Sequence, residues 1–271
     1  MSGDRFRLPA AIALLVGFAT VCFIALLTAV HAVGTDDGLY YALQMKAGVL
    51  PAAGISDGDL RALDGALADY LAGRPNELLL PMDSEPGAYS AMALVVNGDL
   101  QPAFNDREMT HLEDCRKLFA LLRKVRRRLI PWAVLLVVGG AYLLKDRRRV
   151  RRNAWLSPLA ILVPLGAFAA WAAVDFNAAF NAFHRLLFAN DLWLLNPATD
   201  LLIRICPASM FMAMGVRIAL YSLAAMIGLP AAATLLSYVL PKRKEDDTWS
   251  NRDMRRASAP KRMDFGPGAK R

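Results

Sequence analysis

The chain contains only three histidines, and these side chains are the best suited to acid–base chemistry near neutral pH. His111 and His184 each lie in a segment that also carries aromatic and acidic residues. His31 directly follows an apolar run and has little polar surrounding beyond Asp36 and Asp37. A histidine beside an apolar stripe is more often structural than catalytic. We therefore interpret His31 as structural and His111 and His184 as candidate catalytic residues.

The sequence around these histidines lacks the patterns of metal and cofactor sites. Zinc needs three or four ligands, and neither His-x-x-x-His nor His-x-x-Glu-His occurs. There is no glycine-rich phosphate loop and no Gly-x-Ser-x-Gly elbow. A haem held by two histidines is conceivable, but such ligands usually lie within spans rather than beside them. We expect no metal and no cofactor, which leaves proton transfer as the chemistry.

The segment around His111 is predicted to form an amphipathic helix that leads into an apolar run. Asn105 and Glu108 have the spacing of a capping pair, so we expect the helix to begin there. His111 lies beside the apolar stripe, and the acids Glu113 and Asp114 follow closely. An acid near the imidazole could orient the ring and support its charged form.

The segment Phe176–Pro207 lies between two apolar runs but carries too many polar groups for a lipid-facing span. Its first half repeats apolar residues at helical spacing, which predicts a helix with one apolar face. Asn196-Pro197 is expected to turn the chain, after which Thr199-Asp200 opens a second short apolar run. We interpret this segment as a re-entrant or interfacial element at the membrane surface.

The composition is that of a membrane protein, with 56% hydrophobic residues and a mean hydropathy of +0.31. The first apolar run is too long for a signal peptide and has a poor cleavage site, so we expect an anchor. We predict an all-α membrane protein with four transmembrane helices and a mostly helical extracytoplasmic cap. The four runs are Leu8–Val30, Leu129–Leu144, Leu156–Val174 and Val216–Leu240.

The distribution of basic residues predicts the orientation, because lysine and arginine concentrate on the cytoplasmic side. Eighteen basic residues lie in the N-terminus, the second connector and the tail, whereas residues 34–128 hold 11 basic and 14 acidic residues. The five basic residues from Arg123 to Arg128 run against this assignment. The predicted cytoplasmic segments are 1–7, the basic loop 145–155 and the disordered tail 241–271; the predicted extracytoplasmic segments are the cap 31–128 and residues 175–215.

The net charge of +8 does not by itself indicate a nucleic-acid partner. Most of the excess lies in the predicted cytoplasmic flanks, where lysine and arginine meet anionic lipid headgroups. We therefore expect membrane lipids as partners and no nucleic acid.

The three cysteines form no recognisable framework. Cys22 lies in the middle of a span and is expected to be an inert small hydrophobe. Cys115 and Cys206 are both predicted to be extracytoplasmic, so one disulfide is compatible with the sequence, but nothing in their spacing argues for it.

The predicted cap contains two further signals of local structure. Ser56 and Asp59 have the spacing of a helix start, and Gly73 is expected to end that helix. Asn97-Gly98 is the strongest turn dipeptide in the chain and predicts a hairpin.

Two stretches resemble the signature segments of the lipoprotein intramolecular transacylase family. One is Phe104-Asn-Asp-Arg-Glu-Met-Thr-His-Leu-Glu-Asp114, and the other runs from Phe183-His184 through Asn190, Trp193, Leu195, Pro197 and Thr199-Asp200 to Ile203. The resemblance extends to the layout of the spans, and it implies a multi-pass protein of the bacterial plasma membrane. It also implies an activity: the sn-2 acyl chain of a diacylglyceryl-cysteine lipoprotein moves to the amino group of that same cysteine, which leaves a lyso-form lipoprotein. The family's histidines match His111 and His184.

The residues present agree with this chemistry. Ester aminolysis needs a neutral amine, and an α-amino group has a pKa of ~7.7–8.0, so a base assists the attack. The departing glyceryl oxygen needs a proton in return. The two histidines could divide these tasks, with Glu113 or Asp200 setting their tautomers. Four further residues could line the pocket or merely hold its loop, and the sequence favours neither: Asn190, Trp193, Asn196 and Arg204.

Two other classes of function stay open at this point. A non-catalytic four-span protein could use its cap to bind an extracytoplasmic partner. A redox or transport protein would carry a haem or charged residues inside its spans, and only Arg217 approaches such a position.

Overall fold

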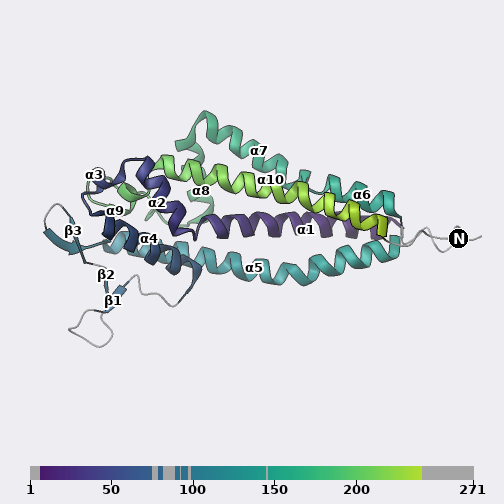
Figure 1. The fold of residues 1–271 in the computed structure, drawn as a ribbon, viewed down its shortest axis with the longest axis horizontal. Coiled ribbons are helices and arrows are strands. Elements are labelled where there is room, and N and C mark those ends of the chain that lie inside the picture. The colour runs from purple at the N-terminus through teal and green to yellow at the C-terminus, as the bar shows by residue number, and fades with distance from the viewer. Residues whose placement is uncertain are drawn as a thin grey trace, which may run out of the picture.

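The protein is an elongated helical bundle with a smaller group of helices and short strands at one end (Figure 1). This computed structural model describes residues 7–74, 79–81, 89–91, 93–96, 99–144 and 146–239. The bundle contains α1 (Arg7–Val33), α5 (Asp106–Leu144), α6 (Arg147–Leu156), α7 (Leu159–Val174) and α10 (Ala208–Val239). The cap contains α2 (Asp37–Lys46), α3 (Val49–Ala53), α4 (Asp57–Ala72), α8 (Phe176–Leu187) and α9 (Leu201–Ile205).

Four helical stretches are long and apolar enough to cross a membrane, so the fold class expected from the sequence is confirmed. Their surfaces are apolar where they face outward: Leu135 is 60% exposed, Val163 65% and Leu220 58%. α10 begins at Ala208 rather than near Val216, so the fourth span extends into the cap.

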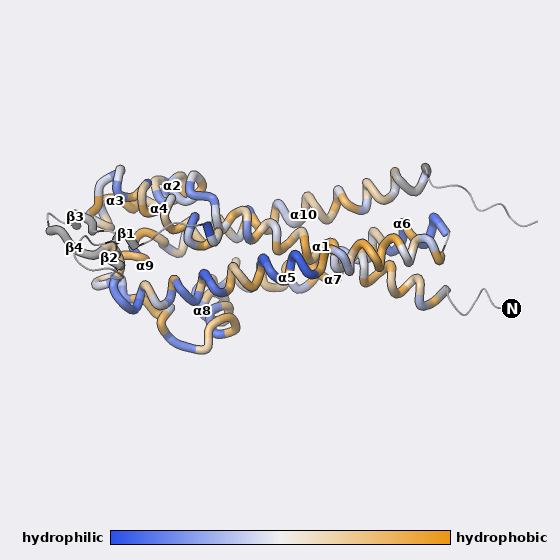
Figure 2. Tube along the Cα trace, turned by 90° about the horizontal axis from the view of Figure 1, so that it is seen from below, coloured by the Kyte–Doolittle hydropathy of each residue, from blue (hydrophilic) through white to orange (hydrophobic). Residues whose placement is uncertain are grey.

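The helix α5 joins the cap to the membrane without a break. Its 39 residues make it about 58 Å long at 1.5 Å per residue, roughly twice the ~30 Å of a hydrocarbon core. Hydrophilic residues mark its cap-side half and apolar residues the other half (Figure 2). The cap-side half therefore stands outside the membrane.

α1 and α5 pack closely along most of their length. A Cβ atom at Gly140 would lie 2.8 Å from Leu14 Cγ and 3.1 Å from the Ala10 carbonyl oxygen. At the other end of the pair, a Cβ atom at Gly34 would lie 2.5 Å from Phe119 Cζ. The two helices are therefore antiparallel, and these glycines permit their close approach.

The basic connector is largely helical, whereas the sequence predicted a loop over residues 145–155. The Asp146 carboxylate accepts bonds from the backbone N–H groups of Arg148 and Arg149 and so caps α6. Val150 and Ala154, one turn apart, are buried, and the Asn153 amide donates to the Ala11 carbonyl at 3.1 Å. The run of arginines suggested a loop in the sequence, but the segment forms a capped helix with one buried face.

The cap is built around α4, which begins and ends as predicted. The Ser56 hydroxyl accepts from the Asp59 N–H at 3.1 Å, and Gly73 ends the helix with φ of 70°. Leu60 and Leu63 are fully buried in a core that also receives Ile205.

Four short strands form two antiparallel pairs beside these cap helices. β1 (Leu79–Pro81) pairs with β2 (Tyr89–Ala91), and β3 (Ala93–Val96) pairs with β4 (Asp99–Pro102). The predicted turn Asn97-Gly98 lies outside the described residues, as do residues 1–6 and the predicted disordered tail 241–271.

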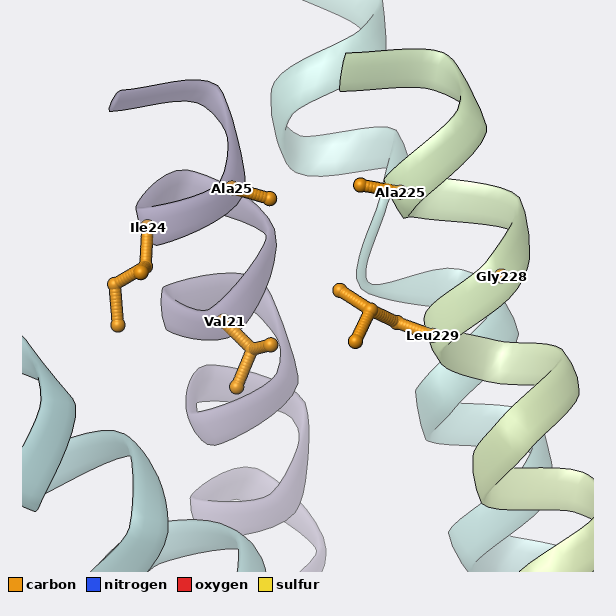
Figure 3. Close-up of a pocket in the computed structure, with 6 residues that line it drawn as sticks. All are labelled: Val21, Ile24, Ala25, Ala225, Gly228 and Leu229. Carbon is orange, nitrogen blue, oxygen red and sulfur yellow. The ribbon is translucent and has the colours of Figure 1, made fainter. Parts of the chain in front are cut away.

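An apolar hollow of about 420 Å³ lies between α1 and α10 (Figure 3). Val21, Ile24 and Ala25 line one side, and Ala225, Gly228 and Leu229 line the other. These residues belong to the membrane-crossing part of the bundle, where the surroundings are lipid. Because none of its six lining residues has a polar side chain, the hollow offers no group for acid–base chemistry.

Candidate active site

The structure brings His111 of α5 and His184 of α8 together, although they come from distant parts of the chain. Their ring centroids lie 6.3 Å apart, with an angle of 39° between the ring planes. His111 is 7% exposed and His184 is 9% exposed, so both imidazoles are largely removed from water. One small group can contact both rings at once.

Each histidine is positioned by a capped helix. Asn105 and Glu108 form the reciprocal capping box of α5, with N–H···O distances of 2.9 and 3.0 Å, and His111 follows one turn later. The Asp175 carboxylate caps α8 by accepting from the Ala178 N–H at 2.9 Å. His184 then lies in the last turn of α8.

Aromatic rings surround His184 on several sides. The ring centroid of Phe180 is 4.0 Å from that of His184, and those of Trp193 and Phe188 are 5.0 and 5.7 Å away. Phe188 also contacts His111 edge-on at 5.0 Å, so this ring bridges the two histidines. Such apolar surroundings strengthen electrostatic interactions inside the site and disfavour buried charge.

One hydrogen bond defines which nitrogen of His184 can act as a base. Nδ1 lies 2.8 Å from the Phe180 carbonyl oxygen, which can only accept, so Nδ1 carries the hydrogen. Burial lowers the pKa of His184 below its usual value, and this backbone bond partly opposes the effect. At neutral pH the ring is therefore uncharged, with Nε2 free to accept a proton.

His111 is held differently. Its Nε2 lies 3.6 Å from the Cys115 thiol, and its buried Nδ1 has no hydrogen-bond partner within the described structure. Burial, with a smaller contribution from His184 and against the opposing effect of Asp114, lowers the pKa of His111 to about 4. Burial also raises the pKa of Cys115 to about 12, so its thiol keeps its hydrogen.

A protonated thiol beside an imidazole nitrogen favours one tautomer of His111. The S–H group can donate to Nε2, because nitrogen is a stronger acceptor than sulfur, and the ring hydrogen is then on Nδ1. His111 then offers an N–H donor, whereas His184 offers a free acceptor at Nε2.

The two acids proposed to set the tautomers do not contact the rings. Glu113 is exposed and pairs with Lys117 at 2.9 Å. The Asp200 carboxylate is buried and accepts from Asn105, Thr199 and the Asn196 backbone N–H at 2.7–2.9 Å. Asp200 therefore holds the loop onto the start of α5, and the acid that acts on His111 is Asp114.

The remaining predicted site residues divide between the pocket and its support. Trp193 packs against His184, and its buried Nε1 has no partner among the described residues. Asn190 donates to Asp114 at 2.9 Å, and the Asn196 side chain accepts from the Ala198 N–H. Arg204 donates to the Asp200 and Ala53 carbonyl oxygens at 3.3 and 3.5 Å.

Glu108 is a structural residue of this site that the sequence showed only as a helix cap. Its Oε2 accepts from the Asn105 N–H, while its Oε1 accepts from the Leu202 N–H at 2.6 Å. One buried carboxylate therefore caps α5 and ties it to the start of α9. The capping spacing was visible in the sequence, but the second partner was not.

A cavity of about 200 Å³ is lined in part by Phe180 and Trp193, the two rings that pack on His184. Its walls include Phe176, Phe180, Trp193 and Phe211, together with the amide side chains of Asn177 and Asn181. Aromatic walls with a few amides suit an acyl chain attached to an ester. Its volume is smaller than that of the hollow between α1 and α10, but Phe180 and Trp193 connect it to His184.

The described residues contain no group of three or more His, Cys, Asp or Glu side chains arranged to hold a metal ion. Cys22, Cys115 and Cys206 are free thiols in the structure. His31 lies on α1 with its ring 6.4 Å from Phe119, outside the site.

Comparisons with known proteins agree with this architecture. No curated protein matches the chain. The lipoprotein intramolecular transacylase Lit from Bacillus cereus, solved in meso as a membrane-integral protein, is 21% identical, with a TM-score of 0.61 over 87% of this chain and 97% of that chain. A histidine-to-arginine variant of the same protein is 21% identical, with a TM-score of 0.59 over 85% of this chain and 92% of that chain. The model of the Lit family, described as lipoprotein intramolecular transacylase Lit, matches residues 15–211. This multi-pass membrane protein therefore belongs to the Lit family and is an acyltransferase.

Proposed function

We propose that this enzyme moves the sn-2 acyl chain of a diacylglyceryl-cysteine lipoprotein onto the amino group of that same cysteine, which yields a lyso-form lipoprotein. The observation that carries the proposal is the pair of buried histidines with ring centroids 6.3 Å apart, beside an aromatic cavity. Membership of the transacylase family supplies the class of reaction.

The reaction needs one net proton transfer. The cysteine amine attacks the carbonyl carbon of the sn-2 ester, and a C–N bond forms. The bond from that carbon to the glyceryl oxygen breaks, and the oxygen leaves as a hydroxyl group. The proton lost by the amine is therefore the proton gained by the glyceryl oxygen.

His184 and His111 divide the work of this transfer. His184 Nε2 takes the proton from the attacking nitrogen and returns it to the glyceryl oxygen. Uncharged His111 donates an N–H hydrogen bond to the carbonyl oxygen while negative charge develops there. A neutral imidazole suits this task in an apolar site, because its hydrogen bond adds no buried charge.

Confinement contributes a large part of the rate. Donor ester and acceptor amine belong to one molecule, and well-held intramolecular pairs reach effective molarities of ~10⁵–10⁸ M. Trp193 and Phe188 keep the glyceryl group between the rings, while the second acyl chain remains in lipid. The cap faces the outer side of the bacterial plasma membrane, both termini face the cytoplasm, and the basic flanks there contact anionic headgroups.

Mass spectrometry of a reporter lipoprotein tests the proposal. The reporter is expressed in a bacterium that makes diacylglyceryl-cysteine lipoproteins, with and without this enzyme. The lyso form with an N-acyl group is expected only when the enzyme is present. His111→Ala or His184→Ala is expected to reduce its yield at least 100-fold, in line with the loss of general acid–base catalysis.

His31→Ala is the matched control, because this histidine lies outside the site and its loss should leave the yield unchanged. Protein levels in the membrane are measured for every variant. Unchanged lipid chemistry in the histidine variants would instead support the alternative of a cap that only binds an extracytoplasmic partner.

A further inference from the structure

Five basic residues on α5 form a cluster that the proposed reaction does not use. They occupy the segment directly before the apolar half of the helix: Arg123, Lys124, Arg126, Arg127 and Arg128. We refer to them as the α5 basic cluster. Positive residues are typically depleted on the extracytoplasmic side of membrane proteins, so five of them within six positions beside the cap need their own explanation.

The cluster lies where the cap meets the bundle. Arg123 Nη1 donates to the Leu71 carbonyl oxygen at 2.6 Å, at the end of α4. Gly73, with φ of 70°, leaves room there: a Cβ atom would lie 2.5 Å from Arg123 Nη2. The end of α1 is beside Phe119, one turn before the cluster.

The exposed side chains around the cluster are apolar on both sides. Leu121 is 54% exposed, while Ile130 and Trp132, on the membrane side, are 47% and 61% exposed. Tryptophan is typical of the boundary between hydrocarbon and headgroups. The long arginine and lysine side chains can extend from this depth to the lipid phosphates.

Among the residues that the structure describes, no carboxylate forms an ion pair with the cationic side chains of the cluster. Arg123 lies within electrostatic range of Arg116, Arg126 and Arg127, all of the same sign. Arg74, two residues past the end of α4, pairs with Asp69 at 2.7 Å, and Arg74, Arg123 and Arg126 all lie within electrostatic range of His31. Mutual repulsion among these cations calls for anions from outside the protein.

We propose that the α5 basic cluster binds the phosphate groups of anionic phospholipids in the leaflet on the cap side. Arg123 is fixed by the backbone of α4, so bound phosphates join the cap to the membrane surface at this point. The lipid neutralises the cluster and sets the depth of α5, and with it the height of the histidine pair above the hydrocarbon. This inference does not depend on the proposed reaction.

A photoactivatable phosphatidylglycerol tests the proposal on the full-length protein in detergent micelles. After illumination, mass spectrometry locates and quantifies the crosslinks. We expect crosslinks to the α5 segment, with competition by unlabelled phosphatidylglycerol but not by phosphatidylcholine or inorganic phosphate. In Arg126→Gln/Arg127→Gln we expect about 25-fold weaker binding, about fivefold for each cation removed near the phosphates.

The matched control is Arg148→Gln/Arg152→Gln, which removes two exposed charges from α6 at the opposite end of the bundle. It should leave the α5 crosslinks unchanged. Arg126→Lys/Arg127→Lys keeps the charge and should bind as the unaltered protein does, which separates lost binding from lost folding. Crosslinks insensitive to Arg126→Gln/Arg127→Gln, or equal competition by phosphatidylcholine or inorganic phosphate, would overturn the proposal.

Discussion

At the scale of single residues, the site consists of two uncharged imidazoles with different free nitrogens. The Phe180 carbonyl fixes the hydrogen of His184 on Nδ1, while the Cys115 thiol faces Nε2 of His111. Burial lowers the pKa of both rings. A pair of this kind provides one proton acceptor and one hydrogen-bond donor without placing charge in the aromatic pocket.

These pKa shifts predict the pH dependence of the reaction. The pKa of His184 is lowered, so its ring gains a proton only below the usual histidine value of about 6.5. Once protonated, His184 can no longer accept a proton, and the rate should fall. His111, with a pKa of about 4, stays neutral over most of this range. Toward about pH 8 the rate should rise and then level, because the substrate amine loses its proton there.

The measurement uses purified enzyme and a synthetic diacylglyceryl lipopeptide, with initial rates from about pH 5 to 9. The titratable groups that act on the His111 ring are Asp114 and His184, and because Asp114 raises the pKa of His111, Asp114→Asn should lower it further. A rate that increases as the solution becomes more acidic than pH 6 would contradict neutral histidines and point to an imidazolium acid.

The sequence indicated both histidines and two acids near His111, Glu113 and Asp114, which the structure places differently. Glu113 is two positions away and projects to another face of the helix, where it pairs with Lys117. Asp114 is three positions away, on the same side as His111, so helical spacing alone could have selected it. Its partner Asn190 could not be predicted, because that contact joins segments far apart in the chain.

At the scale of elements, the site depends on how α5, α9 and the loop before α9 are joined. Glu108 is 1% exposed and accepts hydrogen bonds from two backbone N–H groups. One belongs to Asn105, directly before α5, and the other to Leu202, in the first turn of α9. Asp200 holds the same loop through the Asn105 side chain. These two buried carboxylates join the loop that begins at Asn196 and the start of α9 to the start of α5.

Glu108→Ala should destabilise the cap strongly. The change leaves two backbone donors without their acceptor, and each unsatisfied buried group costs about 1–3 kcal/mol. Glu108→Gln keeps one acceptor oxygen and should cost less. The apparent melting temperature of the protein in detergent, followed by the signal of its tryptophans, reports the loss.

Glu113→Gln provides the control on the same helix, because this carboxylate is exposed and makes only a surface ion pair. It should melt as the unaltered protein does. Equal melting temperatures for Glu108→Ala and Glu113→Gln would show that the bonds of Glu108 do not hold the cap together.

Local signals predicted several element ends well, because capping is a property of neighbouring residues. Ser56, Gly73 and Asn105 cap their helices as their spacing indicated. α6 was missed for the opposite reason: its arginines suggested a loop, and the burial of Val150 and Ala154 depends on α1 and α10. Tertiary packing, rather than local preference, stabilises that helix.

At the scale of the whole molecule, hydropathy predicted the four spans, because each must cover the hydrocarbon with apolar side chains. The meeting of His111 with His184 could not follow from periodicity. That contact arises from α8 folding back beside α5, and only the resemblance to a family implied a shared site. The sequence also did not predict that α10 begins at Ala208, because the first turns of this helix are stabilised by packing against the cap core rather than by a local signal.

Charge asymmetry gives the molecule a definite orientation that can be measured. The predicted cytoplasmic segments together carry 18 of the 32 lysine and arginine residues, so the end with α6 should face the cytoplasm and the cap should face outward. Lys46→Cys on α2 places an exposed thiol in the cap, and Arg148→Cys places one on α6. In intact cells a membrane-impermeant maleimide should label Lys46→Cys strongly and Arg148→Cys only after permeabilisation.

Cys22 and Cys206 are buried, and Cys115, which is partly exposed, is replaced by alanine in both variants so that it does not obscure the measurement. The opposite labelling pattern would place the cap in the cytoplasm. The histidine pair would then lie on the wrong side of the membrane for lipoproteins displayed at the outer surface. The α5 basic cluster would in that case meet the anionic inner leaflet, so this one measurement bears on the reaction and on the lipid site together.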